Sequence, residues 1–185
     1  MLTRKQHTAA RDRAAAMMRR AGVRLTEREV EQMDVADFGL DRLGVEGAQI
    51  VSFFNTERVS AKVIALFPEQ TLPEHWHTAV GEDPGKEETI RVIDGTAYVY
   101  VPGEETVAYG HVPAGKGDCY TVRHEVVMRP GDQLTLQPGV KHWFQAGGAG
   151  AVMYSFSSAA RCALDPFSDP AIVRVTRIAE DARHD

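Results

Sequence analysis

The sequence predicts a mainly β protein, a sandwich or barrel of short strands that is preceded by α-helices. From about residue 49 onward, runs of β-branched and aromatic residues recur between turn residues. No helical segment separates these runs, which argues against a parallel α/β sheet. The first 48 residues are instead rich in helix-forming residues. We therefore expect a helical segment, 1–48, packed on a barrel with a C-terminal tail, 49–185, as one domain overall.

Two helices are expected in the first segment. Residues 4–21 carry good helix formers, and Gly22 is the expected end of this helix. Thr26 and Glu29 have the spacing of a capping box, and the apolar period that follows predicts a second helix as far as about residue 37. Neither helix carries residues with obvious chemistry. We expect them to pack on the outside of the barrel or on a second subunit.

The rest of the chain alternates between expected strands and turns. Asp94-Gly95 lies between two β-runs and predicts a two-residue hairpin. Gly147-Gly148 predicts a further turn, and residues 170–180 are expected to form a strand or helix that closes over one face. The other expected strands are 90–93, 96–101, 106–111, 119–128, 133–136 and 150–157.

Composition excludes several classes of function. The 185 residues carry a formal net charge of −5, which gives general nucleic-acid binding no electrostatic support. No apolar run approaches the roughly 20 residues of a membrane span. The two cysteines lie far apart, as expected for reduced thiols in a cytoplasmic protein. The Arg- and Ala-rich N-terminus is interpreted as an amphipathic helix with a solvated basic face, with a transit peptide as the alternative.

A metal-binding pattern follows the first strands. His75 and His77 are two residues apart, so on a strand both imidazoles project to the same side. Glu88 begins a later strand, and His142 follows a Pro-Gly turn far downstream. Three imidazoles and one carboxylate suit Mn, Zn, Fe, Co or Ni, and an octahedral ion would keep two positions open for a substrate or water. A closed tetrahedral structural zinc is the alternative.

The spacing of these residues resembles the two motifs of the cupin superfamily, H-x-H-x3-4-E-x6-G and G-x5-P-x-G-x2-H-x3-N. Ten residues separate His77 from Glu88, more than the motif has, and Glu88 is preferred to Glu87 because of its spacing to Gly95. Ala146 stands where the motif has Asn. The resemblance implies a jelly-roll (double-stranded β-helix) barrel and a homodimer, since cupins commonly pair through their sheets.

A closer resemblance covers the chain from about residue 73 to 170. The segments His-Trp-His at 75–77, Pro-Gly-Lys-Glu-Glu-Thr at 84–89 and Lys-His-Trp-Phe-Gln-Ala-Gly at 141–147 look like the D-lyxose ketol-isomerase family of cupins. This resemblance implies a manganese-dependent aldose–ketose isomerase. Its expected partners are small free sugars: D-lyxose and D-xylulose, and often D-mannose and D-fructose.

Such an isomerase needs a group that carries a proton between C2 and C1 of an enediol. Lys86 is a catalytic candidate, because on a regular strand it lies on the same face as Glu88 and the expected metal. The alternative interpretation is a solvated surface lysine. Glu87 and Glu125 are further catalytic candidates, although Glu87 on a regular strand would point away from Glu88. Asp165 and Asp169 in the C-terminal segment are additional candidate bases, with loop solvation as the alternative.

Two other functions are compatible with the same ligands. The first is an oxidative cupin, an iron-dependent dioxygenase, because such enzymes also use three histidines and a glutamate. The second is a non-catalytic module in which the metal only anchors a sugar. Neither is separated from the isomerase by the ligand set alone.

Overall fold

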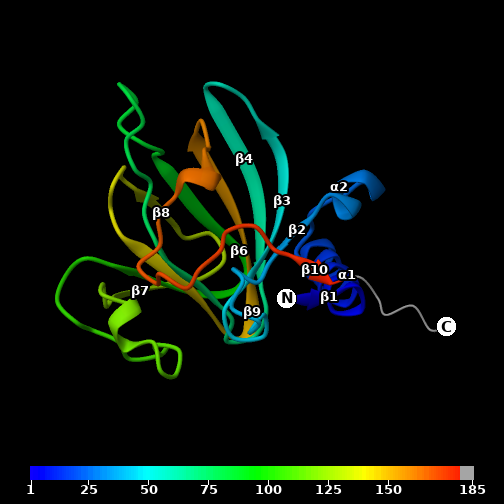
Figure 1. The fold of residues 1–185 in the computed structure, drawn as a ribbon, viewed down its shortest axis with the longest axis horizontal. Helices are drawn as coiled ribbons and strands as arrows, with labels where there is room; N and C mark the ends of the chain where they lie inside the picture. Colours follow the sequence, from blue (N-terminus) through cyan, green and yellow to red (C-terminus); the bar gives the residue numbers. More distant parts are fainter. Residues whose placement is uncertain (180–185) are drawn as a thin grey trace.

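The computed structural model describes residues 1–179, so the last part of the expected 49–185 unit, 180–185, lies outside the described residues. Antiparallel strands form a barrel, and the helices lie against one side of it (Figure 1). The main sheet has the order β2-β3-β4-β9-β6-β7, with β5 paired to β9 and β8 paired to β6. Its strands are β2 (Asp34–Ala36), β3 (Ala48–Asn55), β4 (Val59–Leu66), β5 (Thr71–His75), β6 (Glu88–Val101), β7 (His124–Met128), β8 (Gln133–Leu136) and β9 (His142–Ser158).

Short elements complete the fold. β1 (Leu2–Thr3) pairs in parallel with β10 (Ile178–Ala179), which ties the two ends of the described chain together beside the helices (Figure 1). Two 3₁₀ turns, η1 (Gly117–Cys119) and η2 (Cys162–Leu164), lie in the long connections. None of the described helices is long and apolar enough to cross a membrane.

The first helix confirms the prediction, whereas the second is shorter than expected. α1 (Arg4–Arg20) buries Met17 and Met18 against an apolar cluster on the outside of the sheet. α2 (Glu27–Glu31) begins with the expected capping box between Thr26 and Glu29. The expected continuation to residue 37 is wrong, because residues 34–36 pair with β3 as strand β2. Tertiary pairing with a sheet edge has overridden the local helical period.

The expected hairpin at Asp94-Gly95 is also wrong. β6 runs through these residues as one strand of 14 residues, and its register against β9 shifts on both sides of Gly95. Gly95 has φ of 74°, and a Cβ there would lie 2.0 Å from the carbonyl oxygen of Gly150. Glycine at this point therefore permits a bulge and a close backbone approach, which let a long strand bend around the barrel.

β9 is likewise a long strand that runs through an expected turn. Gly147-Gly148, expected as a turn, lies inside this strand of 17 residues, which also contains the expected strand 150–157. The strand at 133–136 is confirmed as β8, and 119–128 shortens to β7. Residues 106–111 have no regular structure.

Inside the barrel, apolar side chains of β4, β6 and β9 form the main core, which includes Ile64, Val99 and Phe144.

Candidate metal centre

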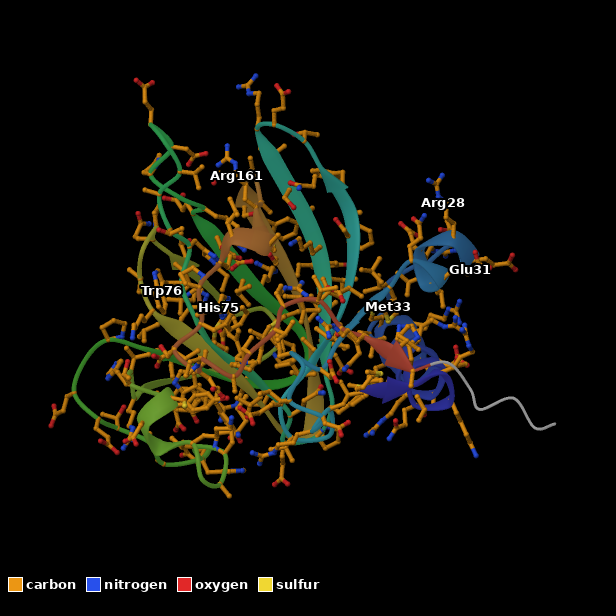
Figure 2. All side chains as sticks on the ribbon, in the orientation of Figure 1. Arg28, Glu31, Met33, His75, Trp76 and Arg161 are labelled. Atoms are coloured by element: carbon orange, nitrogen blue, oxygen red, sulfur yellow. The ribbon has the colours of Figure 1, made fainter. Side chains whose placement is uncertain are left out.

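Three buried histidines lie together inside the barrel. His75 ends β5 and is paired with His142, the first residue of β9, while His77 follows two residues after His75. One ring nitrogen from each lies within 4.8 Å of the others. Figure 2 shows His75 within the body of the barrel, with Trp76 beside it. The predicted meeting of the His-x-His pair with a distant third histidine is therefore present in the fold.

Backbone carbonyls fix the orientation of two of these rings. His75 Nδ1 lies 2.8 Å from the carbonyl oxygen of Pro73, and His142 Nδ1 lies 2.8 Å from that of Val140. A carbonyl only accepts, so each Nδ1 donates and each Nε2 keeps a free lone pair. His142 Nε2 is buried without a hydrogen-bond partner among the described residues. Such an orphaned atom costs about 1–3 kcal/mol unless a ligand satisfies it.

The third ring lies between two carboxylates. His77 Nε2 is 3.0 Å from Glu88 Oε2, and His77 Nδ1 is 3.0 Å from Asp165 Oδ1. His77 Nδ1 is buried and makes no hydrogen bond among the described residues, although the Asp165 carboxylate lies beside it. A carboxylate behind a ligating histidine is a common way to orient the ring and raise its basicity. Asp165 thus contacts the cluster.

Glu88 is held at both oxygens. Its Oε1 accepts hydrogen bonds from Lys86 Nζ, at 2.9 Å, and from the Ser155 hydroxyl. Lys86 is only 8% exposed, so its alternative as a solvated lysine is wrong. The loop before it packs tightly on β5, since a Cβ on Gly85 would lie 2.5 Å from the carbonyl oxygen of His77. This packing aims Lys86 at Glu88.

The ionisation of His75, His142 and Glu88 favours cation binding. Burial alone would lower the pKa of His77, but the Asp165 and Glu88 carboxylates outweigh it and raise that pKa. Burial lowers the pKa of His142 to about 4. Burial and the two neighbouring imidazoles hold the pKa of His75 well below its ordinary value. Burial alone would raise the pKa of Glu88, but the Lys86 ammonium and His77 outweigh it and hold that pKa well below the usual range. Two neutral imidazoles and an ionised carboxylate are the forms that bind a metal.

The donor set therefore fits a divalent first-row ion. Imidazole nitrogens and carboxylate oxygens bind such ions at about 2.0–2.2 Å, so neighbouring ligand atoms at right angles are about 3 Å apart. The contact between His77 Nε2 and Glu88 Oε2 has this separation, 3.0 Å. The free Nε2 atoms of His75 and His142 supply the remaining donors.

The structure does not bring the other two candidate catalytic residues to this cluster. Glu87 is exposed, and its backbone N–H and carbonyl bond Ser158. Glu125 accepts hydrogen bonds from the Tyr100 hydroxyl, at 2.7 Å, and from the N–H groups of residues 108–110. The Tyr100 ring stacks on Trp143, which points to the opposite side of β9 from His142. The geometry therefore supports Glu125 as a clamp for a loop and gives neither carboxylate a contact with the histidines.

Asp169 is likewise a structural group. It pairs with Lys116 and accepts the N–H of Ala171. Two residues that sequence reasoning missed do matter: Ser155, which contacts Glu88, and Lys62, which lines the same cavity as His75 and Glu88. Each is a polar residue among the apolar residues that face the interior, Lys62 on β4 and Ser155 on β9. This break in the apolar pattern could have identified both from the sequence.

The Glu125 clamp predicts a pH-dependent contribution to stability. Burial would raise the pKa of Glu125, but the Gly110 N–H and the Tyr100 hydroxyl outweigh it, so that pKa is lowered. Stabilisation is then complete above the unfolded pKa of about 4.3 and is lost as the pH falls through the folded value. We expect Glu125→Gln to lower the free energy of unfolding by about 1–3 kcal/mol at pH 7 and by less at pH 3.5.

Urea unfolding followed by circular dichroism at both pH values measures this difference. Glu57→Gln, at an exposed position, is the matched control and should change little at either pH. An equal loss for Glu125→Gln at the two pH values would contradict a role for the ionised carboxylate.

Comparison with known proteins identifies the family. No protein-family profile matches the chain. The chain is 50% identical over 173 residues to the D-lyxose ketol-isomerase of Cohnella laeviribosi, covering 93% of this chain and 95% of that one. It is 40% identical over 181 residues to the D-lyxose/D-mannose isomerase of Thermosediminibacter oceani, covering 97% and 100%.

Among solved structures, the L-ribose isomerase of Acinetobacter sp. DL28 in complex with L-ribose superposes with a TM-score of 0.82 at 17% identity, covering 96% of this chain and 98% of that one. The L-ribose isomerase of Cellulomonas parahominis gives a TM-score of 0.79, also at 17% identity and with the same coverage. At this identity the likeness concerns the fold alone, and it confirms the expected mainly β barrel of the cupin type. The identity to the curated relatives, over nearly their whole length, shows that the chain belongs to the D-lyxose ketol-isomerase family.

Proposed function

We propose that the protein is a metal-dependent aldose–ketose isomerase that converts D-lyxose to D-xylulose and D-mannose to D-fructose. The observation that carries the proposal is the buried histidine cluster with the free Nε2 of His142 beside an ionised Glu88. The names of the relatives, D-lyxose ketol-isomerase and D-lyxose/D-mannose isomerase, supply the substrates.

The proposed metal ligands are His75, His77, Glu88 and His142, and manganese is the proposed ion, with Zn, Fe, Co or Ni as alternatives. When bound, the ion supplies positive charge that stabilises the oxygens of the enediol. The fold supplies the rest: apolar walls from Phe38, Phe144 and Phe167 line the cavity next to His75. These walls exclude water, which strengthens the electrostatic interactions at the site.

Lys86 and Asp165 are the proposed catalytic groups. Burial alone would lower the Lys86 pKa, but the Glu88 carboxylate outweighs it and raises that pKa. Lys86 therefore stays protonated, which suits a hydrogen-bond donor to a sugar oxygen and not a base. Besides Glu88, Asp165 is the one carboxylate among the described residues that lines this cavity. We assign it the transfer of the proton from C2 to C1 through its carboxylate oxygen.

The first experiment tests the metal and the reaction together. Metal-stripped protein should produce ketose from D-lyxose and D-mannose only after Mn²⁺ is added back. His142→Ala should lose both bound manganese and turnover, because it removes a ligand that faces the cluster. His111→Ala is the matched control, since His111 is exposed, and it should keep both.

Anaerobic assays separate the alternatives. Isomerisation requires no oxygen, so turnover without oxygen excludes the iron-dependent dioxygenase. Bound manganese with no ketose from any aldopentose or aldohexose would reject the isomerase, and sugar binding without turnover would point to the non-catalytic module.

The catalytic assignments predict a second result. Asp165→Asn should lower kcat about 10²-fold or more even when manganese is added to saturation, because a general base contributes a factor of this size. Glu87→Gln removes a carboxylate that is exposed and should leave kcat unchanged. Measuring kcat together with metal content per protein distinguishes loss of the base from loss of the ion. An unchanged kcat for Asp165→Asn would reject Asp165 as the base.

We also propose a homodimer that forms through an exposed face of the sheet, and a cytoplasmic location, which two free cysteines support. Phe54 and Phe156 both pair with Ala61, and Val59 is two residues from Ala61, so these side chains share one face. Phe54, Val59 and Phe156 are 50%, 51% and 45% exposed. An apolar patch of this kind is typical of an interface.

The dimer is tested by light scattering on the manganese-loaded protein. Phe156→Glu should convert a dimer to a monomer, because it places a charge in the patch. Val175→Glu, at another exposed apolar position, is the control and should keep the wild-type mass. A monomeric wild type would reject the dimer.

A further inference from the structure

We propose that Lys62 binds the distal hydroxyl groups of the open-chain sugar, the ones beyond C2, and so determines how well longer substrates are held. This inference rests on the proposed function, because it takes the end of the sugar that carries O1 and O2 to lie at the histidine cluster. It concerns the other end of the same cavity.

The sheet register places Lys62 next to the site. Lys62 on β4 is paired with Ser155 on β9, and residues directly opposite in an antiparallel pair share a face about 5 Å apart. The Ser155 hydroxyl bonds the Glu88 carboxylate. Ile64, two residues beyond Lys62 on the same face, packs in the interior core. Lys62 therefore projects into the barrel beside Ser155, the residue that contacts Glu88.

Lys62 is a cation whose donors are largely unused. Its Nζ lies 2.8 Å from Cys162 Sγ, and sulfur is a weak acceptor. Within residues 1–179, no carboxylate pairs with it. The other two basic residues of the cavity do have such partners: Lys86 pairs with Glu88, and Arg174 pairs with Asp34 at 2.8 Å. An ammonium group has three donors, so Lys62 still has N–H groups available to bind a ligand. Lys86 and Arg174 already use donors in their ion pairs.

Lys62 also lies where the inner cavity meets an outer cleft. The inner cavity is lined by His75, Lys86 and Glu88, whereas the outer cleft is lined by Asn55 and Arg161. Four residues line both: Ile50, Lys62, Cys162 and Arg174. Figure 2 shows His75 in the body of the barrel and Arg161 near one end of it. A sugar anchored at the histidines would extend its remaining carbons toward this junction.

The charge at the junction favours neutral hydroxyl groups over a phosphate. Asp34 already neutralises Arg174, so Lys62 is the single uncompensated cation among the four residues that line both spaces. A phosphate dianion is generally bound by more than one cation or by a bidentate arginine. One ammonium is enough to donate to hydroxyl oxygens, and such charge-assisted hydrogen bonds are stronger than neutral ones.

The test compares ligands of two lengths on the manganese-loaded protein. D-arabinitol, the unreactive polyol with the five carbons of D-lyxose, reaches the distal position, whereas glycerol does not. We expect Lys62→Met to raise the Kd of D-arabinitol about tenfold by calorimetry and to leave that of glycerol unchanged. Lys62→Arg, which keeps the charge and the donors, should restore most of the affinity. In turnover, Lys62→Met should raise KM for D-lyxose with kcat nearly unchanged.

Three results would overturn the proposal. These are an unchanged Kd for D-arabinitol in Lys62→Met, an equal weakening of both polyols, and a loss of kcat without a change in KM. Tighter binding of D-lyxose 5-phosphate than of D-arabinitol, lost in Lys62→Met, would replace hydroxyl recognition by anion recognition. Because polyol binding requires no turnover, a wild type that binds D-arabinitol but makes no ketose would reject the isomerase and still leave the Lys62 result readable.

Discussion

The pairing of β9 with three other strands is the constraint on which the site depends. β9 pairs with β4, β5 and β6, so one strand aligns residues from four parts of the chain. Its first residue, His142, is in register with His75, and Ser155 near its other end bonds Glu88. A slip of one residue would turn His142 out of the barrel and Trp143 into it. The register of β9 therefore determines whether the three histidines meet.

Burying this many polar groups in one place is costly, and the structure offsets the cost by partnering almost every atom. Backbone carbonyls bond the Nδ1 atoms of His75 and His142, and Lys86 with Ser155 bonds one oxygen of Glu88. Among the described residues, the Nε2 atoms of His75 and His142 have no hydrogen-bond partner, and that of His142 is fully buried. Unpartnered polar atoms in an otherwise satisfied cluster are common where a ligand completes the site.

Two further carboxylates hold long loops on the outside of the barrel without entering the site. Glu74, the neighbour of His75, points to the other face of β5 and accepts the N–H groups of Thr121 and Val122 at 2.6 and 2.9 Å. Glu125 does the same for residues 108–110. The alternation of side chains along each strand thus separates carboxylates that fix loops from the carboxylate that faces the histidines.

The sequence by itself determined the class of fold, the helical start and the His-x-His pair of the histidine cluster, because periodicity and His-x-His spacing are local properties. It did not determine that Asp94-Gly95 bends a long strand, since the same dipeptide suits a hairpin and only the pairing with β9 distinguishes the two. Nor did it determine which acidic residue faces the cluster. Glu125 and Asp165 are both carboxylates, and the sequence does not distinguish between them as candidates. Only the tertiary structure places Asp165 3.0 Å from His77 and turns Glu125 to the opposite face. Facing depends on register between strands that are distant in the chain, and no local pattern encodes it.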